Sequence, residues 1–316
     1  MAKANHGARF VFYKNVYDRD HLYLYDVDQQ TPFGLKASGS DFSAPSVAVS
    51  PDYQFMAASS SGGTLSLFGL SRIQWLRHPD DEIDANLLFG TLTFFWNNGG
   101  TDWGKAAWSP KIDNGMMHLA FSTNDAPDIN FHEWRYNNIW VVDVPSKRWN
   151  LSDVMQIQNS FFAPLGINIL ATRHRLTGAN ANDGDMAWSP DGQQMAFVSD
   201  RGGSPELYIL ETNGVDQNVR RITNSSAMES SPSWSPDGQW LVFASSEDNH
   251  SQLYIVNVSS GESRRLTADS HQNTQALWSP DGQYIVYRSD DLITLIHPDG
   301  SNIQRLFRGD NPVWIP

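Results

Sequence analysis

Several carboxylates, one histidine and one lysine stand just before short apolar segments that recur along the chain, and they are the residues best placed to do chemistry. They are Asp102, Lys105, Asp183, Asp185, Glu229, His271 and Asp310. If the recurring segments gather around one axis, these side chains surround the mouth of a channel, where carboxylates could bind a hard cation, an amine or a basic peptide. The alternative is structural, since Asp and Glu in such loops often accept hydrogen bonds from nearby backbone N–H groups.

The segment 123–138 is a second candidate site. It carries Phe131, His132, Trp134, Arg135 and Tyr136 within a few residues of one another. Aromatic and arginine side chains are typical anchors of protein interfaces, so this segment is a candidate partner-binding loop. The alternative is that the rings fold back and cover the edge of a sheet.

The elements that must position these residues are defined by a sequence repeat. Its copies read AWSPDGQQMAFVSD from Ala187, SWSPDGQWLVFASS from Ser233 and LWSPDGQYIVYRSD from Leu277, with weaker copies from Ala48 and Ala107. In Ser-Pro-Asp-Gly the proline presets φ for a turn and the glycine can take φ > 0, which predicts a hairpin between two short strands. Two further strands complete each copy, and four short strands per repeat are typical of one β-propeller blade. The turn aspartates are therefore predicted to be structural; they are Asp191, Asp237 and Asp281.

The repeat resembles that of the TolB-like six-bladed propellers, the WD40-like or PD40 repeat family, because three copies carry WSPDG without a mismatch. The resemblance implies an all-β fold, a six-bladed β-propeller of four-stranded antiparallel blades. We expect a single propeller domain over 1–316, with blades at about 46–77, 105–152, 185–224, 231–268 and 275–307. The sixth blade is expected to combine 312–316 with N-terminal strands within 9–37, so that pairing of the two ends closes the ring. The smaller N-terminal domain of TolB has no recognisable counterpart, so the resemblance extends to the propeller only.

The long insertions are expected on one face of the propeller. Crossovers at about 78–104 and 153–184 and the segment 123–138 fall there, whereas the tight turns occupy the other face. Because binding residues tend to lie on long loops, we expect a non-catalytic binding or scaffold propeller that recognises a protein or peptide through the insertion-bearing face. Two alternatives stay open: a channel-site enzyme or a propeller that binds a small ligand or metal, and a gating propeller domain of a larger multidomain protein.

Composition narrows the partners and the chemistry. The formal net charge is −13 and the sequence pI is near 5.0, which argues against nucleic acid and favours a basic partner. Cysteine is absent, and neither a signal-peptide core nor a membrane-length apolar stretch is visible. No nucleophile elbow, HExxH motif or P-loop occurs, so we predict no catalytic residue and no cofactor, and we leave open a divalent cation in the channel. We expect a monomeric domain. Because TolB-like propellers are often exported, the resemblance implies a place in the periplasm or outside the cell.

Overall fold

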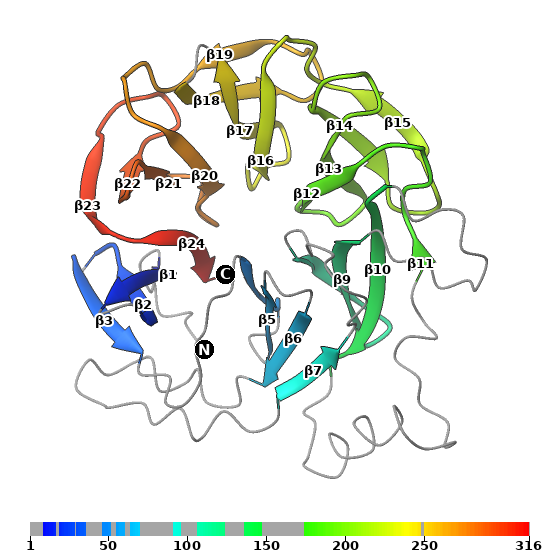
Figure 1. Ribbon diagram of the computed structural model, residues 1–316, viewed down its shortest axis with the longest axis horizontal. Helices are drawn as coiled ribbons and strands as arrows, with labels where there is room; N and C mark the ends of the chain where they lie inside the picture. Colours follow the sequence, from blue (N-terminus) through cyan, green and yellow to red (C-terminus); the bar gives the residue numbers. More distant parts are fainter. Residues whose placement is uncertain are drawn as a thin grey trace.

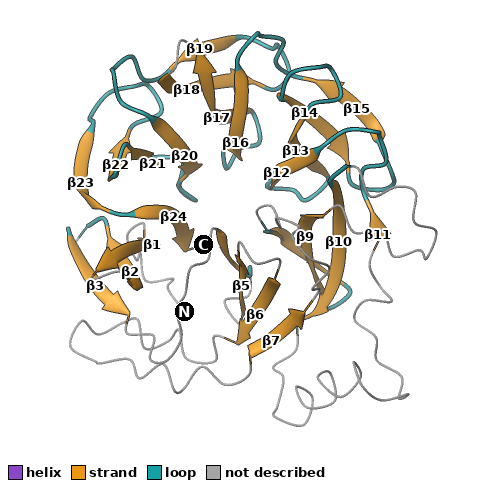
Figure 2. Cartoon of the chain, viewed as in Figure 1, coloured by secondary structure: helices purple, strands orange, loops and turns teal. Residues whose placement is uncertain are grey.

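The chain is an all-β propeller. The computed structural model describes residues 9–16, 19–28, 30–35, 46–51, 55–60, 64–69, 91–95, 106–123, 136–146, 174–247 and 250–315. Within these ranges, all the regular secondary structure is β-strand (Figure 2). The strands form six four-stranded sheets in the described residues, and Figure 1 shows them arranged around a common centre. All strand pairs are antiparallel, as the repeat predicts for propeller blades.

Five of these sheets are each built from four consecutive strands. The first contains β4 (Ser46–Val49), β5 (Phe55–Ser60), β6 (Thr64–Gly69) and β7 (Thr91–Phe95). The second contains β8 (Ala107–Asp113), β9 (Met116–Thr123), β10 (Asn138–Pro145) and β11 (His174–Arg175). The third contains β12 (Asp183–Trp188), β13 (Gln194–Ser199), β14 (Glu206–Glu211) and β15 (Gln217–Arg221). The fourth contains β16 (Met228–Trp234), β17 (Trp240–Glu247), β18 (His250–Asn257) and β19 (Ser263–Arg265), and the fifth β20 (Asn273–Trp278), β21 (Ile285–Ser289), β22 (Leu292–Ile296) and β23 (Gln304–Arg308).

The remaining sheet is composite, because it joins the two ends of the chain. Its order is β24-β1-β2-β3, with β24 (Asp310–Ile315), β1 (Arg9–Val16), β2 (Arg19–Asp26) and β3 (Thr31–Leu35). Phe10 lies opposite Trp314 in the β1–β24 register. The described ranges thus contain five blades that are continuous in sequence and one sheet assembled from both termini, whose pairing satisfies strand edges that would otherwise be open.

The Ser-Pro-Asp-Gly turns close the first hairpin of a blade through short-range hydrogen bonds. Ser189 Oγ donates to Asp191 Oδ1 over 2.6 Å, and the backbone N of Gln193 donates to the same oxygen over 3.0 Å. The backbone N of Gln194 donates to Ser189 Oγ over 2.9 Å, and Gly192 has a φ of 67°. The same bonds recur in the next two blades, around Ser235–Asp237 and Ser279–Asp281. The prediction that these aspartates serve turn geometry is confirmed.

The tryptophan before each turn joins neighbouring blades. Its indole Nε1 donates to a backbone carbonyl of the preceding blade in four cases: Trp108 to Ala48 (3.2 Å), Trp188 to Ala107 (3.1 Å), Trp234 to Ala187 (3.1 Å) and Trp314 to Leu277 (3.0 Å). Trp278 differs, because its Nε1 is buried and has no hydrogen-bond partner among the described residues. Its backbone N instead donates to Ser233 Oγ over 3.1 Å.

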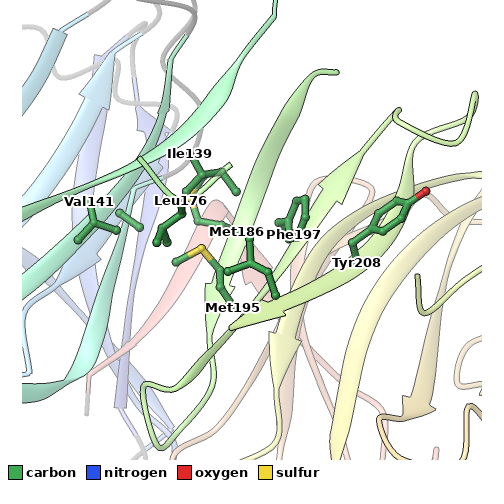
Figure 3. Packing of buried hydrophobic residues seen from close by; sticks show 9 residues of the cluster. Ile139, Val141, Leu176, Met186, Met195, Phe197 and Tyr208 are labelled. Carbon is green, nitrogen blue, oxygen red and sulfur yellow. The ribbon is translucent and has the colours of Figure 1, made fainter. Parts of the chain in front are cut away.

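Apolar side chains fill the spaces between adjacent sheets. Between the second and third sheets, Ile139 and Val141 of β10 pack with Leu176, Met186, Met195, Phe197 and Tyr208 (Figure 3). Most of these side chains are inaccessible to solvent. Burying each large apolar side chain contributes about 1.5–3 kcal/mol, so the blades are held to one another along their faces.

Candidate functional site

Three residues occupy equivalent positions where the innermost strand of a blade begins: Asp183 in β12, Glu229 in β16 and Asn273 in β20. Each lies opposite a serine of the second strand, Ser199, Ser245 and Ser289 respectively. Their side chains are buried, with residue exposures of 1%, 4% and 0%. The sequence predicted Asp183 and Glu229 at a channel mouth, but the structure buries both between blades.

Asp183 is the centre of a buried ion pair. Both of its carboxylate oxygens lie 3.1 Å from Nη2 of Arg201, whose guanidinium is also 3.4 Å from Asp216 Oδ1. The same guanidinium lies over the rings of Phe197 and Tyr208. Burial raises the pKa of Asp183 above its ordinary value, while hydrogen bonding to Ser199 and the charge of Arg201 offset part of that rise. The geometry is that of a structural bridge, because the Arg201 guanidinium faces both oxygens of this buried carboxylate.

Asp185 and Glu229 also make contacts within the protein. Asp185 has a φ of 48°, a left-handed conformation, and its Oδ2 accepts a hydrogen bond from the backbone N of Ser231 in the next blade. Gln275 repeats this arrangement, with its Oε1 3.0 Å from the backbone N of Asn311. Ser225 Oγ donates to Glu229 Oε1 over 2.8 Å. The Asp185 bond matches the structural alternative stated for the sequence, in which loop carboxylates accept backbone N–H groups, while Glu229 accepts a hydroxyl instead.

His271 and Asp310 are the more exposed members of the predicted group. His271 Nδ1 lies 2.6 Å from Asp290 Oδ2, with 36% and 49% of the two side chains exposed. A backbone hydrogen bond from Gln272, followed by the hydrogen bond with His271, lowers the pKa of Asp290. Asp310 Oδ1 lies 3.6 Å from Nε of Arg288. His271 thus faces a carboxylate, and Asp310 faces a guanidinium group.

Of the remaining predicted residues, Tyr136 alone lies within the described ranges. Asp102, Lys105, Phe131, His132, Trp134 and Arg135 lie outside the described residues. Tyr136 is described and half-buried, and its backbone O accepts a hydrogen bond from Asn138 Nδ2 over 3.2 Å. No group of three or more His, Cys, Asp or Glu side chains that could hold a metal ion occurs among the described residues. The part of the chain that the structure describes contains no helix that could span a membrane.

An Arg-x-Thr motif, for which the sequence predicted no role, ends the fourth strand of three blades. Its copies are Arg175–Thr177, Arg221–Thr223 and Arg265–Thr267. In each copy the arginine Nε donates to the threonine backbone O, over 2.5, 2.7 and 2.6 Å. The threonine Oγ1 accepts a hydrogen bond from the backbone N of Ile139, Leu207 and Leu253, respectively, each over 2.9 Å. The repetition of the motif was the signal, and it marks a polar junction within each blade.

The fold and these contacts define a β-propeller whose described inner carboxylates bond to other parts of the protein, within their own blade or in a neighbouring one. The match to a known family is partial: Gmad1, the lipoprotein LpqB beta-propeller domain, matches residues 175–283, about one third of the chain.

Among solved structures, TolB from Acinetobacter baumannii is similar with a TM-score of 0.64 and 20% identity, over 98% of this chain and 67% of that one. A TolB assigned to Agrobacterium tumefaciens is similar with a TM-score of 0.59 and 19% identity, over 98% of each chain. A puromycin-hydrolyzing peptidase of Mycobacterium tuberculosis is similar with a TM-score of 0.57 and 15% identity, over 97% of this chain and 43% of that one. At these identities the likeness establishes a TolB-like propeller fold and leaves activity to be argued from the site.

Proposed function

We propose that this chain is a non-catalytic binding platform that recognises a protein or peptide through the face carrying the inter-blade crossovers and the segment 123–138. One observation carries the proposal: the predicted channel carboxylates that are described bond to other parts of the protein. Asp183 pairs with Arg201, Asp185 bonds Ser231, and Asp310 faces Arg288. Such contacts rigidify a scaffold, and a rigid scaffold loses less entropy on binding a partner.

The proposal includes the ring itself. We count the composite sheet of β24 and β1–β3 as a sixth blade, so that 1–316 forms one six-bladed domain. It is supported by the antiparallel register of β1 with β24 and by the Trp314 bond to Leu277, which repeats the bond that joins other blades. The likeness in fold to TolB, and the partial match to a lipoprotein propeller, support a place in the periplasm or outside the cell.

A paired-variant capture experiment tests the proposed face. One variant replaces 124–135 with a Gly-Ser linker, and a matched control changes Ile112, Val215 and Ile303 in the tight turns to serine. Proteins captured by the wild type from an extract are identified, and the binding of each, once purified, is measured by calorimetry. We expect a partner that is lost with the linker variant and retained by the control. Equal binding by all three proteins would place recognition elsewhere.

The proposal includes no cofactor. Elemental analysis of extensively dialysed protein measures any metal retained per chain. A stoichiometric divalent ion that disappears in both Asp183→Ala and Glu229→Ala, while the fold persists by circular dichroism, would contradict the platform and favour a channel site. Trace, substoichiometric metal that is unchanged in those variants agrees with the proposal.

A further inference from the structure

The repeat distributes charge unevenly between the two ends of a blade. Ser-Pro-Asp-Gly places an aspartate in the turn after the first strand, while Arg-x-Thr places an arginine at the far end of the fourth strand. Because neighbouring strands are antiparallel, the first-to-second and third-to-fourth turns lie at the same end of a sheet. We call this end the turn face; its described residues are 26–28, 30, 50–51, 109–116, 145–146, 189–194, 211–217, 235–240, 257–263, 279–284 and 296–304.

The first-to-second turns form a continuous arc. A methyl group on Gly238 would lie 3.8 Å from Cδ of Pro190, and one on Gly282 would lie 3.7 Å from Cδ of Pro236. At the preceding junction, a methyl group on Gly192 would lie 3.1 Å from Ser109 Oγ. Each turn therefore touches the turn of the blade before it, and their aspartates are neighbours on one surface.

This surface is acidic, and the least compensated carboxylates are those of its first-to-second turns. Its exposed carboxylates are Asp28, Asp113, Asp191, Asp237, Glu262, Asp281 and Asp299. Lys111, which is half-buried, is the one lysine or arginine within the described turn residues. Two arginines reach the third-to-fourth turns from outside them: Arg201 contacts Asp216, and Arg264 donates to Pro298 O beside Asp299. The hydrogen bonds that hold the turns also keep carboxylates ionised, because those from Ser189 and Ser301 lower the pKa of Asp191 and of Asp299.

Four carboxylates at the opposite end of the blades are paired with arginines. The pairs are Asp183 with Arg201, Glu206 with Arg221, Asp310 with Arg288 and Asp291 with Arg308. The Ser-Pro-Asp-Gly aspartates of the turn face have no arginine partner of this kind in the described residues, so they leave negative charge on that face. A field of one sign on one face steers and retains partners of the opposite sign.

Exposed apolar side chains occur in the same set of turns. Ile112, Val215 and Ile303 have 44%, 48% and 52% of their surface exposed, and they are three of the four large hydrophobic residues exposed in the described ranges. Each lies in a different blade, within a turn that also carries an acidic residue. Apolar contacts between charges suit a protein segment, whereas the acidic field repels nucleic acid and anionic lipid.

We propose that the turn face is a second interaction surface, one that takes a basic segment of a partner protein with apolar side chains interspersed among its cations. It is distinct from the crossover face proposed above, and its loss would leave that function in place.

Binding of a labelled peptide of repeated Lys-Lys-Leu, measured by fluorescence anisotropy at about 0.15 M salt, tests the surface. The test variant is Asp191→Asn with Asp237→Asn and Asp281→Asn, in which the amide oxygen can still accept the turn hydrogen bonds. The matched control is Asp290→Asn with Asp291→Asn and Asp310→Asn, which removes the same charge at the opposite end. We expect the test variant to bind about tenfold more weakly than the wild type, and the control to change by less than about twofold.

Carbodiimide cross-linking of the same peptide to the wild-type chain, mapped by mass spectrometry, provides a reading that does not depend on variant folding. We expect cross-links at Asp191, Asp237, Asp281 and Asp299. No binding by the wild type, equal weakening in both variants, or cross-links concentrated at Asp290 and Asp291 would each overturn the proposal.

Discussion

Replacing Trp188 or Trp278 with phenylalanine compares two tryptophans that differ in one hydrogen bond. Both are half-buried at equivalent positions and pack against the cores between neighbouring blades. Trp188 Nε1 donates to Ala107 O over 3.1 Å, whereas Trp278 Nε1 is buried with no partner in the described part of the chain. The two substitutions remove the same ring atoms, so the packing loss is similar and the hydrogen bond separates them.

The expected difference is about 2 kcal/mol. Trp188→Phe loses a hydrogen bond worth about 1 kcal/mol and leaves the Ala107 carbonyl without this donor. Trp278→Phe removes a buried donor whose desolvation costs about 1–3 kcal/mol, which offsets part of the packing loss. For a chain of this size, with a urea m-value of about 4 kcal/mol/M, a 2 kcal/mol difference separates the two unfolding midpoints by about 0.5 M.

Urea titrations followed by far-ultraviolet circular dichroism measure both midpoints against the wild type. The reasoning requires Trp188→Phe to be the less stable variant. If Trp278→Phe unfolds at the same or a lower urea concentration, the inter-blade hydrogen bond contributes nothing measurable and this account of the tryptophan repeat is wrong.

Two further predictions concern the carboxylates. Arg201→Met leaves the buried Asp183 without its guanidinium and should destabilise the fold by about 3 kcal/mol, and adding Asp183→Asn should recover much of that loss in the same urea assay; a double variant no better than the single one would argue against an ion pair. The pKa of Asp191 is lowered by the Ser189 hydroxyl, so its contribution to stability is present above the ordinary value of 3.8 and is lost as pH falls through the lower folded-state pKa. Ser189→Ala should therefore reduce stability at neutral pH and weaken its dependence on pH below about 4, and unchanged midpoints between pH 2 and 7 would contradict this.

Local chemistry made the hairpins readable from the sequence. The groups that close the turn are near one another in sequence. The bond from Ser189 Oγ to Asp191 Oδ1, for example, joins residues two positions apart. The fold class followed from the repetition of that turn, because a unit of four strands buries its faces only against copies of itself. The sequence also predicted that the N-terminal and C-terminal strands pair, because the C-terminal segment offered one strand and the N-terminal segment three, which together make a four-stranded sheet.

The role of the carboxylates was decided by the tertiary structure. Sequence position brought Asp183, Asp185 and Glu229 to the start of inner strands, which was compatible with either a site or a set of caps. The choice depended on partners at a distance: Arg201 lies 18 residues from Asp183, and Ser231 lies 46 residues from Asp185 in the next blade. Burial and pairing depend on how strands and blades pack in space, so the sequence identified these residues, whereas only the tertiary structure determined which charges neutralise one another.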